Sequence, residues 1–220
     1  MANLIIALVA FVGSHFALSH PLRASLVARL GEKGFLGLYT LVAFVTLGWA
    51  GWAFGRAPRG PLLFTANGDW AWIVASVLTL IALVLLLGSL RGNPALPGAE
   101  GSAPAVPSGV FRVTRHPMMW GIALWAGAHA LVMPDPRTLA LMGAMAVLAL
   151  AGSALQDAKK RRLDPAWPAW QAQTRFLPNL LHPPAAGGLV WLAALTGWLA
   201  ATWAHVPLGG IAAGIWRWVG

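Results

Sequence analysis

The sequence contains no cysteine, which excludes disulfide bonds, iron–sulfur clusters, thiolate metal ligands and cysteine nucleophiles. Charged residues are also scarce, at 10% of 220 residues, whereas about a quarter of an average soluble domain is charged. Hydrophobic residues make up 58% of the chain. This composition indicates an integral membrane protein whose principal partner is the lipid bilayer.

Acidic side chains and tyrosine are scarce as well. The chain has six Asp and Glu against fifteen Lys and Arg, and one Tyr against thirteen Trp. A basic excess is common in nucleic-acid-binding proteins, but here the basic residues lie in short loops between apolar runs. That placement is the topology signal of a membrane protein, so we expect no nucleic-acid partner.

Apolar runs predict the fold class. A bilayer core requires roughly 20 helical residues, and six stretches reach or approach that length. No stretch shows the alternating pattern of a strand. The sequence therefore predicts an all-α integral membrane protein, a bundle of about six transmembrane helices in a single membrane domain over residues 1–220. The predicted spans are 3–20, 35–55, 70–90, 117–133, 138–156 and 188–206.

The distribution of basic residues between loops predicts the orientation. The larger group consists of Arg23, Arg29, Lys33, Arg91, Arg112, Arg115, Lys159, Lys160, Arg161, Arg162 and Arg175. The smaller group consists of Arg56, Arg59, Arg137 and Arg217. The positive-inside rule places the larger group in the cytoplasm, with both termini in the periplasm. Residues 92–109 then form a flexible cytoplasmic linker, and 157–182 a basic amphipathic stretch at the interface.

Two histidines lie within apolar runs. His15 is about 18 Å of helix inward from Asn3, and His129 is about 19 Å from His116 at the opposite edge of its span. In a core about 30 Å thick, these depths differ by less than ~10 Å, so the two imidazoles can converge. An ionisable residue at such depth is a functional candidate, the alternative being a neutral histidine that hydrogen-bonds to a neighbouring helix.

Two facing imidazoles from separate helices favour haem iron, with His15 and His129 as the metal ligands. Arg23 and Arg115 are the nearest cationic partners for the haem propionates. Zinc is the competing metal, but it requires three or four protein ligands, and the acidic residues are few and peripheral. Small residues around His129 suit an apolar macrocycle: Ala123, Ala126, Gly127 and Ala128.

Three other histidines, His20, His116 and His182, each precede a proline, which predicts helix boundaries there. Pro117 suits the first turn of a helix, where exposed amides together with Arg115 favour binding of an anion.

Three motifs carry a resemblance to a known family. "SHFALSHPLR", "TRHPMMWGIALWAGAHAL" and "DAKKRR" resemble the NnrU family of bacterial membrane proteins, over most of the chain. The resemblance implies a link to denitrification, through production of nitrite and nitric oxide reductase activity. That family is similar to the zeta-carotene isomerase of plants and cyanobacteria, an integral membrane enzyme that uses haem b.

The isomerase resemblance implies specific haem ligands. His129 matches an axial ligand and His116 matches the histidine of the isomerase's RHP motif. The other axial ligand matches His15 best, with His20 as the fallback. A cysteine of the isomerase is replaced by Ala126, which excludes exchange of a thiol for an imidazole and argues against redox-switched isomerase chemistry.

A more distant resemblance is to isoprenylcysteine and phospholipid methyltransferases, which bind S-adenosylmethionine at the cytoplasmic face. Trp120 and Gly121 follow the RHP sequence here, and the later part of the pattern matches Asp157, Trp167, Trp170 and Pro178. The tyrosine of that pattern is missing, and Asp157 replaces a glutamate.

Three functions follow from these observations. The first is a haem b protein for redox sensing, gas sensing or electron transfer. The second is a membrane enzyme, a polyene isomerase or an S-adenosylmethionine-dependent methyltransferase, that acts on an apolar small molecule and depends on His116, Arg115 and Asp157. The third is an assembly factor in which every histidine is structural.

Overall fold

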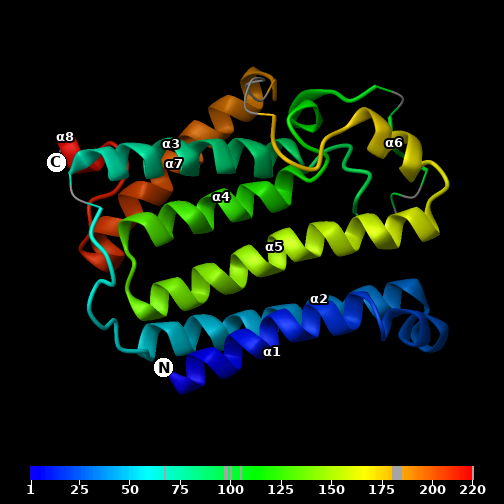
Figure 1. Cartoon of the computed structure of the whole chain (residues 1–220), viewed down its shortest axis with the longest axis horizontal. Helices are drawn as coiled ribbons and strands as arrows, with labels where there is room; N and C mark the ends of the chain where they lie inside the picture. Colours follow the sequence, from blue (N-terminus) through cyan, green and yellow to red (C-terminus); the bar gives the residue numbers. More distant parts are fainter. Residues whose placement is uncertain (67, 97–98, 100, 105, 180–184, 220) are drawn as a thin grey trace. The chain divides into compact units, whose positions relative to one another are not determined.

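The computed structural model describes residues 1–66, 68–96, 99, 101–104, 106–179 and 185–219, and these contain helices and no strand. The prediction of an all-α membrane protein is confirmed (Figure 1). The helices are α1 (Ala2–Ser19), α2 (Arg23–Arg56), α3 (Asp69–Gly88), the 3-10 helix η1 (Gly109–Arg112), α4 (Pro117–Val132), α5 (Pro136–Leu163), α6 (Trp167–Gln173), α7 (Gly188–Gly209) and α8 (Trp216–Val219).

Five of these helices are long and apolar enough to cross a membrane, namely α1, α2, α3, α5 and α7. The fourth predicted span, α4, is shorter, with 16 residues or about 24 Å. Pro117 fixes its start, and Pro134 lies two residues past its end, where a proline disfavours helical continuation. The chain is therefore a multi-pass membrane protein in which one apolar helix falls short of the usual spanning length.

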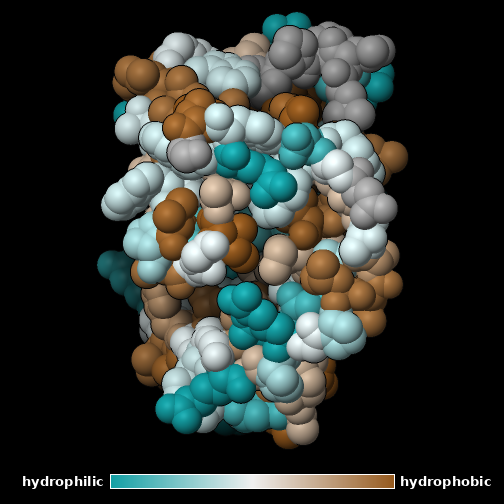
Figure 2. Space-filling view, turned by 90° about the vertical axis from the view of Figure 1, so that its left-hand side faces the viewer, coloured by the Kyte–Doolittle hydropathy of each residue, from teal (hydrophilic) through white to brown (hydrophobic). Residues whose placement is uncertain are grey.

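Apolar side chains at the surface agree with a bilayer environment. In α2, Leu41, Phe44 and Val45 are 62%, 70% and 62% exposed. Figure 2 shows hydrophobic side chains at the surface among hydrophilic ones. Contact with lipid removes the cost that such exposure has in water.

The chain forms two compact units, and α5 begins in the first and continues into the second. The first unit consists of residues 1–65 and 133–148. Its core is built largely from small side chains, which let helix backbones approach closely in a membrane. One cluster of buried residues consists of Leu4, Ala7 and Leu8 of α1 with Ala50, Ala53 and Ala57 at the end of α2, against which Ala140, Leu141 and Ala144 of α5 pack.

Helix α2 begins earlier than the span predicted from residue 35. Gly31 interrupts it with φ 70° and ψ 169°, a conformation that only glycine adopts readily. Residues 23–30 are therefore a separate helical segment before the kink. The hydrophobic pattern detects the segment after Gly31, because the segment before it contains Arg23 and Arg29.

The second unit consists of residues 66–132 and 149–220, of which 67, 97–98, 100, 105, 180–184 and 220 are outside the description. Helix α3 packs against both α4 and α7. At the α3–α4 crossing, a Cβ on Gly121 would lie 2.7 Å from the carbonyl oxygen of Ala82, so glycine permits this close approach. Across the other contact, the indole of Trp198 donates to the hydroxyl of Thr79 over 2.9 Å.

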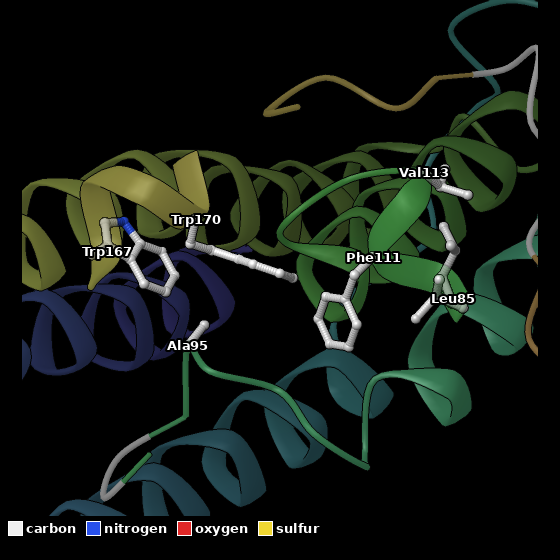
Figure 3. Packing of buried hydrophobic residues seen from close by; sticks show 7 residues of the cluster. Leu85, Ala95, Phe111, Val113, Trp167 and Trp170 are labelled. Carbon is white, nitrogen blue, oxygen red and sulfur yellow. The ribbon is translucent and has the colours of Figure 1, made fainter. Parts of the chain in front are cut away.

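A buried aromatic cluster forms the core of the second unit (Figure 3). Trp167 and Trp170 of α6 lie beside Phe111 of η1, with the ring centroids of Phe111 and Trp170 5.8 Å apart. Ala95 belongs to this cluster, although it comes from the predicted linker 92–109. The flexibility of that linker and the single-domain organisation stay predictions.

Candidate functional site

The RHP sequence lies in a short connection that hydrogen bonds fix to the segment after α6. Thr114 donates its hydroxyl proton to the carbonyl of Phe176 over 2.7 Å. The backbone N–H of Arg115 donates to the carbonyl of Arg175 over 2.8 Å. Pro117 then begins α4, as its fixed φ favours. The side chains of Arg115 and His116 are thereby held at the start of α4.

Asp157 of α5 joins these two side chains in a polar cluster that we call the RHD cluster: Arg115, His116 and Asp157. The Nε of Arg115 donates to one carboxylate oxygen over 2.9 Å, and its Nη2 donates to the same oxygen over 2.5 Å. His116 lies with Nε2 2.9 Å from the other oxygen. A carboxylate accepts, so Nε2 carries the hydrogen, and in the neutral imidazole Nδ1 has the lone pair.

The free nitrogen of His116 is the chemically notable atom of the RHD cluster. His116 is 2% exposed, and its Nδ1 is buried with no hydrogen-bond partner in the described part of the chain. The rings of Phe176 and Trp167 lie 5.6 Å and 6.3 Å from the imidazole. A carboxylate on one imidazole nitrogen fixes the tautomer and makes the other nitrogen a better ligand, so the cluster can accept a hydrogen bond at Nδ1.

A second group of imidazoles lies in the same unit. Nδ1 of His129, in the last turn of α4, is 2.9 Å from the carbonyl of Trp125. The ring centroids of Trp125 and His129 are 4.6 Å apart, and those of His129 and His205 of α7 are 6.1 Å apart. The structure thus brings together His129 and a histidine to which the sequence assigned no role.

His15 belongs to the first unit. Its Nδ1 is 2.8 Å from the carbonyl of Phe11, and its ring makes edge contacts with Phe11 and Tyr39 at 4.5 Å and 5.3 Å. The hydroxyl of Ser19 lies 3.5 Å from that of Tyr39. Because His129 belongs to the second unit, the predicted convergence of His15 and His129 stays a prediction.

The remaining predicted site residues lie at the junction of α1 and α2. His20 caps the end of α1, where its backbone N–H donates to the carbonyl of Phe16 over 3.1 Å. Arg23 forms a 2.6 Å ion pair with Glu32 and lies over the ring of Phe35. The helix boundaries predicted at His20 and His116 agree with the structure, while His182 lies outside the described residues.

Comparison with known proteins identifies the chain through its family. The family model described as NnrU protein matches residues 3–213. No curated protein and no solved structure matches the chain.

Proposed function

Since the chain belongs to the NnrU family, we propose that it is a haem b protein of the inner membrane that serves nitrogen-oxide metabolism, as an electron carrier or as a redox or gas sensor. We place both termini in the periplasm, in accordance with the distribution of basic loops. Haem iron supplies one-electron exchange and, where a coordination position opens, binding of a diatomic gas.

The tautomers of the two histidines within α1 and α4 are the observation that carries the proposal. In His15 and His129, Nδ1 faces the carbonyl four residues earlier, at 2.8 Å and 2.9 Å. A carbonyl only accepts, so Nδ1 carries the hydrogen and Nε2 has the lone pair that a metal requires. Such a hydrogen bond on the far nitrogen fixes the tautomer and the ring orientation of metal-bound histidines. The residues present therefore suit haem.

The surroundings of His129 also suit an apolar cofactor. The ring of Trp125 lies 4.6 Å from the imidazole, and α4 is apolar with small residues near it, such as Ala126 and Ala128. The carbonyl of Trp125, in the same helix, holds the ring of His129 in place. Its orientation as a metal ligand therefore does not depend on a neighbouring helix. A carrier role requires its imidazole ligands to remain bound, whereas sensing of nitric oxide requires one to dissociate.

Absorption spectroscopy tests the proposal. The full chain, purified in detergent from bacteria that synthesise haem, is expected to show a Soret band and a pyridine haemochrome spectrum of b type. His129→Ala is expected to lose the haem or shift its spectrum, because an axial nitrogen is missing. His182→Ala is the matched control, a histidine to which no ligand role is assigned. A colourless wild-type chain, or a His129→Ala chain with an unchanged spectrum, contradicts the proposal.

A second candidate function is catalysis at the RHD cluster. The buried Nδ1 of His116, which has no hydrogen-bond partner in the described part of the chain, favours it. This candidate is a membrane enzyme, a polyene isomerase or an S-adenosylmethionine-dependent methyltransferase acting on an apolar small molecule. A colourless chain that retains S-adenosylmethionine through purification, and loses it in His116→Ala but not in His182→Ala, supports the methyltransferase. Absence of both haem and S-adenosylmethionine argues instead for an assembly factor.

A further inference from the structure

We propose that His205 is a metal ligand together with His129, so that the two imidazoles of the second unit bind one transition-metal centre through their Nε2 atoms. The metal's identity rests on the proposed function: with haem b bound, it is the haem iron, and His205 rather than His15 is the second axial ligand. Here the two histidines are called the imidazole pair.

The separation of the rings is the first support. Two nitrogens on opposite sides of one metal ion, each at about 2.0–2.1 Å, lie roughly 4 Å apart. The centroid of each ring lies farther from the metal than its nitrogen does, so the two centroids must be more than 4 Å apart. The centroids of His129 and His205 are 6.1 Å apart, with 33° between the ring planes. The separation of the ring centroids is therefore compatible with one shared ion.

The protonation of both rings is the second support. Nδ1 of His205 is 2.8 Å from the carbonyl of Ala201, which repeats the contact of His129 with Trp125 at 2.9 Å. Both Nδ1 atoms therefore carry hydrogen, and both Nε2 atoms carry lone pairs. Neither Nε2 has a hydrogen-bond partner among the residues that the structure describes. Two lone pairs that face no donor are suited to a shared electrophile, since they cannot hydrogen-bond to each other.

The position of His205 is the third support. It lies in the apolar helix α7, a membrane-spanning candidate, and its side chain is exposed. It lies near the C-terminal end of that helix, where an imidazole whose Nε2 has no partner among the described residues is a functional candidate. Coordination of a metal satisfies the lone pair of His205 and of His129 at once.

The number of ligands selects the class of metal centre. Within the described residues, no group of three or more His, Cys, Asp and Glu side chains is placed to hold an ion. A zinc ion with two protein ligands is poorly bound, because structural and catalytic sites supply three or four. A porphyrin contributes four nitrogens of its own, so its iron needs only two from the protein. The imidazole pair therefore fits haem better than a bare divalent ion.

The experiment compares His205→Ala with His15→Ala, the competing ligand, and with the control His182→Ala in the full chain. Ferric wild-type protein is expected to have the low-spin absorption and electron paramagnetic resonance spectra of two-imidazole ligation. His205→Ala is expected to lose the low-spin signature, and added free imidazole is expected to restore it. Restoration shows that the variant is folded and lacks only a ligand. His182→Ala, the control, is expected to keep the low-spin spectra, as is His15→Ala.

The outcomes separate this inference from the proposed function. Low-spin haem that is unchanged in His205→Ala overturns the inference alone, as does loss of the low-spin signature in His15→Ala only. Wild-type protein without haem overturns the proposed function. In that case the purified chain is titrated with Co²⁺ alone: visible cobalt absorption that is lost in His205→Ala supports the imidazole pair as a metal site, and absence of any cobalt absorption overturns it.

Discussion

The two units of the chain use polar side chains in different ways. In the first unit, polar groups mainly bond to nearby backbone: Asp135 accepts from the N–H groups of Arg137 and Thr138 at the start of α5, and Arg137 donates to carbonyls at the end of α2. In the second unit, polar side chains from separate elements meet each other, and each group leaves an imidazole nitrogen without a partner among the described residues. The RHD cluster leaves Nδ1 of His116, and the imidazole pair leaves two Nε2 atoms. In the first unit, the buried nitrogen that has no hydrogen-bond partner within those residues is Nε of Arg137.

This difference indicates where chemistry is concentrated. Hydrogen bonds to helix ends use up donors and acceptors that membrane helices otherwise leave unsatisfied, so they stabilise the fold and leave little for a ligand. Side chains that meet across elements and retain unused nitrogens are typical of binding and catalytic sites. Apart from His15, the polar groups of the first unit thus have a structural role, and the second unit contains the candidate sites.

The largest expected effect is in the RHD cluster. Asp157→Ala leaves Arg115 and His116 without their shared acceptor, and breaking a buried ion pair from one side costs about 3–5 kcal/mol in unfolding free energy. Asp69→Ala is the matched control, because its 3.5 Å pair with Arg217 is solvent-accessible and contributes about 0–1 kcal/mol. Thermal unfolding in detergent measures both. If both variants lower the unfolding free energy equally, the RHD cluster is no more stabilising than the exposed Asp69–Arg217 pair.

A second effect is expected where α3 and α4 cross. Gly121→Ala places a Cβ 2.7 Å from the backbone carbonyl of Ala82, so the helices must separate, at a cost of about 1–3 kcal/mol. Gly127→Ala, on the same helix, meets nothing within 4 Å and is expected to be neutral or slightly stabilising. Thermal unfolding temperature and spectrum are recorded together. If Gly121→Ala is as stable as Gly127→Ala, the helices are not in the described close approach.

The corresponding effect in the first unit is of similar size and purely structural. Arg137 donates from Nη1 to the carbonyls of Phe54 and Ala57, both at 3.2 Å, and stacks on the ring of Phe54. Arg137→Ala is expected to lower the unfolding free energy by about 1.5–3 kcal/mol, the usual range for a charged hydrogen bond. Arg56→Ala, which loses only a stacking contact with Trp52, is the control.

Thermal unfolding and the haem spectrum of Arg137→Ala together test whether the first unit contributes to the haem site. The variant's thermal unfolding temperature is expected to fall, while its haem spectrum at a temperature where it is folded is expected to match that of wild type. A changed ligand spectrum in this variant would give the first unit a part in the site.

The sequence predicted the fold class and the membrane helices because each depends on local composition. Apolar runs mark five spanning helices whatever their neighbours are. The start of α2 was missed because Gly31 separates a charged helical segment from the apolar one. The length of α4 was overestimated by one residue, and only the structure shows that its 16 residues fall short of the usual span.

Side-chain convergence was predicted less well, because it depends on packing between distant elements. Arg115, His116 and Asp157 were associated through resemblance to methyltransferases, whereas their contacts join residues about forty positions apart in sequence. His205 received no role because it lies two residues before Pro207, at the end of its predicted span. Helix α7 continues through Pro207 to Gly209. A rule that treats every histidine inside an apolar helix as a candidate would have included it.

The haem content of the purified wild-type chain tests the central claim most directly. We expect haem b in an amount equal to that of the protein, measured as pyridine haemochrome against protein mass. A pure, folded chain that contains no haem, even from cells that overproduce it, would contradict the account.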